Sequence, residues 1–195
     1  MKGRSPSAAL FCWTLFFLIL FVAPLTCTAQ SAKPESEVLG SWTYDPSSVV
    51  YYSKGTMVVT LDEHTFEYKM SLISLVGSQE APRSISGKFD IEETSRSGSV
   101  ITLTSTRDYT EWTHKTTIEV EMDKITIITS SFGKPSGEFL GRDFDIFTLS
   151  PDHKKLDLKY FRSSSQTSIP EHPLAVVYSF TREPTPTVDR MQMQR

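Results

Sequence analysis

The chain has 195 residues, with 20 basic and 23 acidic side chains, and 38% of its residues are hydrophobic. This length suits one domain with a sizeable core, and the small acidic excess argues against a nucleic-acid partner, which requires a basic face. Both cysteines, Cys12 and Cys27, lie close to the N-terminus, so we expect no disulfide in the rest of the chain.

Residues 1–29 have the order of a secretory signal peptide. Lys2 and Arg4 precede an uncharged apolar run, and the small residues 27–29 follow it. An uncleaved membrane anchor and lipidation at Cys27 are the alternatives. Cleavage would leave 18 basic and 23 acidic residues. We therefore expect an exported protein, secreted or periplasmic, that contacts a membrane only through an uncleaved signal segment.

Strand-like patterns fill the chain between a short polar linker at residues 30–38 and an expected disordered tail at residues 183–195. The tail has two prolines and no apolar periodicity. Within 39–182 the apolar residues recur with a period of two, which is typical of antiparallel strands with one buried face. The clearest alternation occurs in Thr65–Met70, Ile85–Ile91, Lys155–Phe161 and Leu174–Arg182.

Short polar links that contain aspartate separate many of these strands. Asp62–His64, Met122–Lys124 and Ser150–His153 suit tight turns, so the strands they join pair antiparallel. Such a meander either closes into a barrel or splits into two packed sheets, and the short links favour an all-β barrel of about 8–10 strands. Functional side chains are expected in the longer links, which are Ser71–Ser84, Arg107–Lys115, Ser130–Arg142 and Arg162–Pro173.

Two ends of the domain resemble the lipocalins and related calycins. Gly40-Ser41-Trp42 is similar to the G-x-W motif on the first strand of that family, and Arg182 is similar to the arginine that packs across the tryptophan. The resemblance covers Leu39 to Arg182 and is closest to the lipocalin-like domains of exported bacterial proteins. It implies structural closure of a barrel by Trp42 and Arg182, with an interior that holds a small hydrophobic ligand, but it identifies no ligand.

The apolar strand faces supply the candidate ligand-binding residues. In a barrel they would line a pocket for a small apolar or amphipathic guest, or fill the interior as a solid core. The alternative function is a protein-interaction or inhibitor module that acts through its loops, where Tyr109 and Trp112 are the aromatic candidates. The residues expected to bind a ligand are Phe66, Tyr68, Phe89, Leu158, Tyr160 and Tyr178.

Catalytic signals are few, so we expect no enzyme, no metal and no cofactor. The four histidines lie in turns or links without metal-ligand spacing, and no motif for a nucleophile or a phosphate is found. Asp143 and Asp145 share a strand face, which permits a weaker hypothesis of an acid–base pair; the alternative is two solvated carboxylates. Nothing in the pattern demands a partner subunit, so we expect a monomer.

Overall fold

The structure is a computed structural model that describes residues 36–47, 52–76, 79–164 and 176–182, all within the unit Lys33–Arg195. The expected signal peptide (1–29) and tail (183–195) lie outside these ranges. Within the described ranges, no helix is long and apolar enough to cross a membrane.

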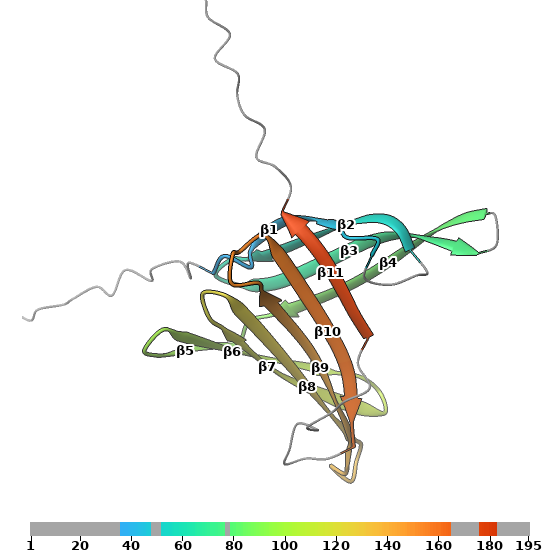
Figure 1. The fold of residues 1–195 in the computed structure, drawn as a ribbon. Coiled ribbons are helices and arrows are strands. Elements are labelled where there is room, and N and C mark those ends of the chain that lie inside the picture. The colour runs from blue at the N-terminus through green and yellow to red at the C-terminus, as the bar shows by residue number, and fades with distance from the viewer. Residues whose placement is uncertain (1–35, 48–51, 77–78, 165–175, 183–195) are drawn as a thin grey trace, which may run out of the picture. The chain divides into compact units, whose positions relative to one another are not determined.

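The described residues form one antiparallel sheet of eleven strands, as Figure 1 shows. Consecutive strands pair along the chain, as expected for a meander, except β4 and β5. The last strand pairs with the tenth and also with the first, so it lies between them. The strands are β1 (Gly40–Tyr44), β2 (Tyr52–Leu61), β3 (Thr65–Val76), β4 (Gln79–Asp90), β5 (Glu93–Ser97), β6 (Val100–Asp108), β7 (Trp112–Val120), β8 (Lys124–Gly133), β9 (Phe139–Leu149), β10 (Lys155–Ser163) and β11 (Val176–Arg182).

The sheet is not closed, so the expectation of a closed barrel of about 8–10 strands is wrong in both closure and strand number. β4 and β5 follow each other in the chain but form the two opposite edges of the sheet. β5 pairs with β6 through Glu93↔Thr104 to Ser97↔Val100, and this hairpin occupies the edge of β6 that β4 would need for closure. β4 and β6 therefore do not pair, and the sheet stays open between β4 and β5.

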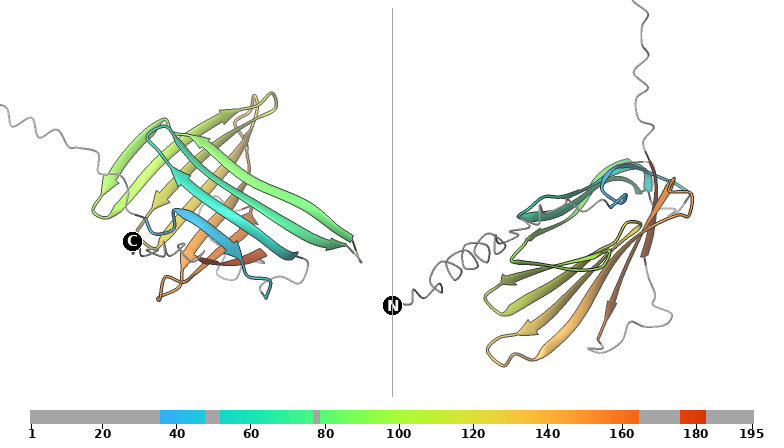
Figure 2. Two further views of the ribbon diagram at one scale, coloured as in Figure 1. Left: turned by 90° about the horizontal axis from the view of Figure 1, so that it is seen from above. Right: turned by 90° about the vertical axis from the view of Figure 1, so that its left-hand side faces the viewer.

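Hydrogen bonds tie β6 to the link between β4 and β5 and to β4 itself. The Glu92 N–H donates to the Thr104 carbonyl over 2.9 Å. Nη2 of Arg107 on β6 donates to the Lys88 carbonyl of β4 over 2.9 Å. The right-hand view of Figure 2 shows that the sheet bends, so that β2–β4 lie opposite β7–β9. One face of the sheet is therefore concave.

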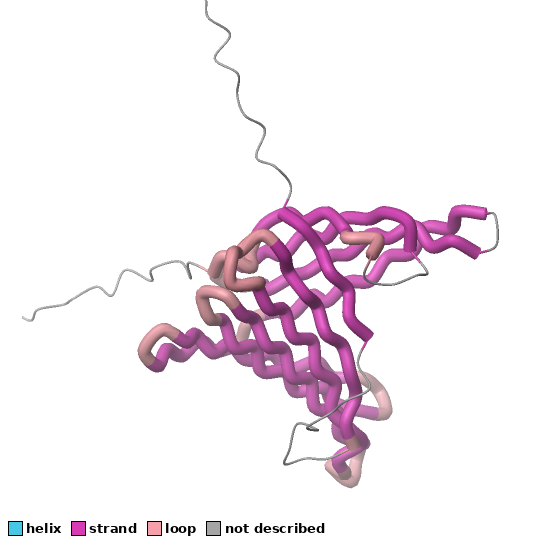
Figure 3. The backbone as a smooth tube through the Cα atoms, in the orientation of Figure 1, coloured by secondary structure: helices cyan, strands magenta, loops and turns pink. Residues whose placement is uncertain are grey.

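Several links that we expected to be loops are continuous hairpins, and Figure 3 shows how little of this region is loop. In the link Ser71–Ser84, residues 71–76 belong to β3 and residues 79–84 to β4, and these strands pair from Thr65↔Asp90 to Val76↔Gln79. Arg107–Lys115 and Ser130–Arg142 likewise contain strand ends. The expectation failed because apolar alternation marks only the buried part of a strand, whereas backbone pairing continues where both faces meet solvent.

The hydrophobic core covers one end of the concave face. Each fully buried apolar side chain contributes about 1.5–3 kcal/mol. Val38 falls in the expected linker but is 0% exposed and belongs to this core. The largest fully buried side chains in the core are Trp42, Phe66, Phe147, Phe180, Met57 and Met70.

Trp42 and Arg182 meet as the resemblance implied, but they do not close a barrel. They are register partners between β1 and β11, which lie in the interior of the strand order. The Arg182 guanidinium carbon lies 5.1 Å from the Trp42 ring centroid. Nη2 of Arg182 donates to the Glu37 carbonyl over 2.8 Å, and Nε1 of Trp42 donates to the Val38 carbonyl over 3.0 Å. The pair thus fixes the segment just before β1, which contains Glu37 and Val38, against the sheet.

Candidate functional site

Toward one end of the concave face, polar side chains replace the apolar side chains of the core. On β9, Phe147 and Leu149 belong to the core, and Asp145 and Asp143 follow on the same face because successive residues alternate between faces. The register places Tyr160 opposite Asp145 and Arg162 opposite Asp143. We call Tyr68, Asp143, Asp145, Tyr160 and Arg162 the tyrosine–aspartate cluster.

Tyr68 reaches this cluster from the opposite side of the concave face. Its hydroxyl donates to Oδ2 of Asp145 over 3.2 Å, and its ring lies against Phe147 with 5.3 Å between the centroids. Both contacts join β3 to β9, which are not neighbours in the sheet. Pairing of β9 with β10 therefore assembles four of the cluster residues, and bending of the sheet brings Tyr68 to them.

Asp143 has partners on β10. The Tyr160 hydroxyl donates to Oδ1 of Asp143 over 3.4 Å, and Nε of Arg162 lies 3.8 Å from the same oxygen. Gly141 leaves room for this arrangement, because a Cβ there would lie 3.2 Å from both Nε and Nη2 of Arg162. The β8–β9 register also shifts beside Gly141, between Ser131 and Phe132. Such irregularities commonly re-aim side chains at functional sites.

The cluster shifts the protonation equilibria of its members. Burial, supplemented by the negative charge of Asp143, raises the pKa of Asp145 to about 6, while the hydrogen bond from Tyr68 opposes the shift. Burial also raises the pKa of Tyr68, with the Asp145 charge adding to the effect. Burial and the charges of Asp143 and Asp145 raise the pKa of Tyr160. At neutral pH the site therefore presents neutral phenols beside the largely ionised carboxylate of Asp145.

His114 and two exposed aromatic rings lie at the same end of β7. The pKa of His114 is lowered, first by burial and then by Arg107 and Arg162, while Asp143 opposes the shift. The imidazole is therefore mainly neutral at pH 7. Its ring stacks on Trp112 with 6.4 Å between centroids and lies 5.0 Å from Tyr109. Tyr109 and Trp112, the aromatic candidates for a protein contact, are 39% and 38% exposed.

The six residues expected to bind a ligand separate into core and surface. Phe66 and Leu158 are buried in the packed core, and Phe89 packs partly buried against it. Tyr178 forms a ring contact with Tyr52, and burial, supplemented by Tyr52, raises its pKa to about 12. Only Tyr68 and Tyr160 belong to the tyrosine–aspartate cluster.

Sequence reasoning missed Gly141, Arg162 and His114 as parts of this site. Strand alternation could have placed Arg162 on the face of Tyr160, because the two are separated by one residue. The space that Gly141 leaves depends on the register shift, which has no clear sequence signal. Asp143 and Asp145 do share a face, as the alternation indicated, and both are partly buried rather than fully solvated.

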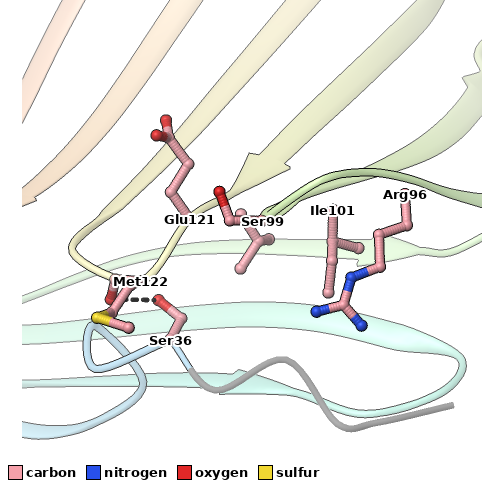
Figure 4. Close-up of a pocket in the computed structure, with 7 residues that line it drawn as sticks. Ser36, Arg96, Ser99, Ile101, Glu121 and Met122 are labelled. Carbon is pink, nitrogen blue, oxygen red and sulfur yellow. Dashed lines mark hydrogen bonds between the residues drawn. The ribbon is translucent and has the colours of Figure 1, made fainter.

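A separate small pocket lies at the apolar end of the sheet, between the N-terminal segment and the strands β5–β7 (Figure 4). Its volume is about 150 Å³, which is below the ~300 Å³ at which sites for small organic ligands usually begin. Ser36 closes one side by donating to the Met122 carbonyl over 3.3 Å. The lining residues are Ser36, Arg96, Ser99, Ile101, Val120, Glu121 and Met122, none of which we expected to bind a ligand.

No metal site emerges from the part of the chain that the structure describes. Those residues contain no group of three or more His, Cys, Asp or Glu side chains that could hold an ion. The tyrosine–aspartate cluster has two carboxylates, but one of them already faces Arg162.

In its described residues the chain is an all-β protein with one open antiparallel sheet of eleven strands. No protein-family model, curated protein or solved structure matches the sequence. The likeness to lipocalins therefore stays a prediction that depends on Gly40–Trp42 and Arg182.

Proposed function

We propose that this is an exported, lipocalin-like protein that binds a small amphipathic ligand non-covalently at the tyrosine–aspartate cluster. The observation that carries the proposal is the position of Tyr160. It continues the concave face of β10 beyond the buried Leu156 and Leu158, yet it is 41% exposed. The strand face that is buried in the core at Leu158 is therefore exposed to solvent at Tyr160, whose ring lies beside Asp143.

The surroundings of Tyr160 suit a ligand with an apolar body. Val176 is the register partner of Tyr160 on β11 and is 45% exposed, so the two side chains offer adjacent apolar surface. Asp143 and the Tyr160 hydroxyl provide polar atoms within a few ångströms of that surface. Ligand sites in proteins typically combine apolar walls with a few converging polar groups.

Binding of octanol, a neutral amphipathic probe, tests the proposal. We expect octanol to shift the amide NMR signals of β9–β11 in the full chain and the substitution Tyr160→Ala to weaken binding at least several-fold. Val58→Ala is the matched control, because Val58 is similarly exposed at 41% on the outer face of β2. Shifts spread over the whole sheet, or equal weakening by both substitutions, would contradict the proposal.

A second candidate function is protein interaction through the hairpin tips. Trp112 pairs with Gly133, whose backbone lies beside the Leu140 side chain, and Leu140 is 48% exposed. Nζ of Lys134 holds the two tips together by contacting Asp108 at 2.8 Å. A photo-crosslinking residue at position 112 should then capture a partner that the same residue at position 58 does not, and equal capture would argue against this function.

A further inference from the structure

Asp145 is a partly buried carboxylate that has no basic partner among the described residues. Its Oδ2 accepts the Tyr68 hydroxyl, and within the described part of the chain no Lys, Arg or His nitrogen lies within 4.0 Å of it. Asp143, two residues away, differs because Arg162 lies 3.8 Å from its Oδ1. A buried charge without a counter-ion is costly, and natural sites usually supply a cation.

Among the described residues, the groups nearest to Asp145 come from four strands, and the one cation of the cluster, Arg162, is paired with Asp143. β3 contributes Tyr68, β8 contributes its register partner Ile127, β9 contributes Asp143, and β10 contributes Tyr160. The cluster thus has two carboxylates and one guanidinium, and the phenol rings add electron-rich faces that attract cations. A ligand with an anionic head group would bring a further negative charge to this place, and a neutral one would leave the charge uncompensated.

We propose that the ligand bound at the tyrosine–aspartate cluster is a primary amine with an apolar body, whose ammonium group pairs with Asp145. This inference rests on the proposed function and specifies the chemical class of its ligand. The ammonium would donate to Oδ1 of Asp145, while the apolar body would lie along the exposed faces of Tyr160 and Val176. Charge-assisted hydrogen bonds are roughly twice as strong as neutral ones, so the amine gains affinity over an alcohol of equal length.

Protonation of Asp145 should be linked to binding. The carboxyl has a pKa of about 6 in the free protein, so it is partly protonated at mildly acidic pH. An ammonium stabilises the ionised form and lowers that pKa, so amine binding releases protons between about pH 5 and pH 7. The amine itself stays charged throughout this range.

The test compares three probes with one alkyl chain: octylamine, octanol and octanoate. Isothermal titration of the full chain at about pH 7.5 should show octylamine binding at least about tenfold more tightly than octanol, and octanoate binding most weakly. In Asp145→Asn the affinity for octylamine should fall to that for octanol, while octanol binding persists. Asp157→Asn, which changes a carboxylate on the other face of β10, should leave all three affinities unchanged.

The outcomes separate this inference from the proposed function. Equal binding of octylamine and octanol, tighter binding of octanoate, or undiminished octylamine binding by Asp145→Asn would overturn the amine inference and leave the proposed function standing. Failure of all three probes to bind would overturn both. Circular dichroism shows whether Asp145→Asn folds. If it does not, the affinities of the wild-type protein for octylamine and octanol are compared at pH 7.5 and pH 5. The preference for octylamine must decline at pH 5, and an unchanged preference overturns the inference.

Discussion

Tyr68 on β3 and Asp145 on β9 share a hydrogen bond of 3.2 Å, although 77 residues separate them in the chain. Four strands, β2, β1, β11 and β10, lie between them in the sheet. The bond therefore spans the concave face rather than following the backbone ladder. It joins two parts of the sheet that face each other across the concave face.

Tyr68→Phe removes the hydroxyl and should lower the free energy of unfolding by about 1–2 kcal/mol at neutral pH, because a hydrogen bond to a charged acceptor is lost. It should also raise the pKa of Asp145 further, since the bond from Tyr68 opposes the effect of burial. Urea denaturation and an NMR titration of the carboxyl signal measure the two effects. Tyr109→Phe is the control at an exposed ring, and equal effects of both substitutions would contradict the prediction.

The variant Asp145→Asn should gain stability relative to the wild type, and this gain should grow as the pH rises. The folded pKa of about 6 exceeds the ordinary value of 3.8, so the folded state retains a proton that the unfolded chain has lost. Ionisation therefore destabilises the folded wild type progressively between about pH 4 and pH 6 and fully above that range. The stability difference between variant and wild type should grow by roughly 1–2 kcal/mol from pH 4.5 to pH 7.5 in urea titrations. A difference that is constant with pH would show that Asp145 keeps its ordinary pKa.

Gly141→Ala should displace the Arg162 guanidinium and destabilise the protein. The added methyl group would lie 3.2 Å from two guanidinium nitrogens, and the backbone φ of +155° is one that residues with a side chain rarely adopt. We expect a loss on the order of 1–3 kcal/mol in thermal or chemical unfolding. Gly133→Ala is the control, because its nearest neighbour would lie at an ordinary 3.6 Å. Similar losses at both positions would argue against a special role for Gly141.

Arg182→Ala should cost about 1–2 kcal/mol of stability, since it removes a cation–π contact and a hydrogen bond to the Glu37 carbonyl. Arg182→Lys keeps the charge but loses the planar stacking on Trp42, so it should recover only part of this loss. Denaturant unfolding followed by tryptophan fluorescence measures both variants. Wild-type stability of Arg182→Ala would mean that Trp42 alone fixes the N-terminal segment.

Pro82→Thr should promote self-association. The Ile91 N–H donates to the His64 carbonyl, so bonded pairs alternate along β3 and β4, and the Pro82↔Ile73 pair is not hydrogen-bonded. The backbone nitrogen of Pro82 therefore points away from β3, toward the free edge of the sheet. Because proline has no N–H there, another strand cannot pair with the edge at this position. Sedimentation velocity should show more dimer or aggregate for Pro82→Thr than for the control Pro151→Thr in a turn. Equal behaviour would show that the edge is protected by other means.

The alternation of apolar residues predicted the strand faces well. Asp143 and Asp145 on one face, and Phe66 and Tyr68 on another, follow from the period of two, which is a local property of extended backbone. Strand ends were predicted poorly at Ser71–Ser84, because the β4 part, Gln79–Ser84, contains no buried residue that would mark it as a strand. The six-residue ligand set was predicted from one face only, so it mixed core residues with Tyr160.

Sequence alone determined the all-β class, the antiparallel pairing of neighbours and the meeting of Trp42 with Arg182 at the two ends of the domain. The open sheet was decided by tertiary structure, because the short β5 hairpin occupies an edge that closure would require. The same holds for the contact between Tyr68 and Asp145. Local periodicity assigns each side chain to a face, but which faces meet depends on how the whole sheet bends, and that is a balance of twist and packing over all eleven strands.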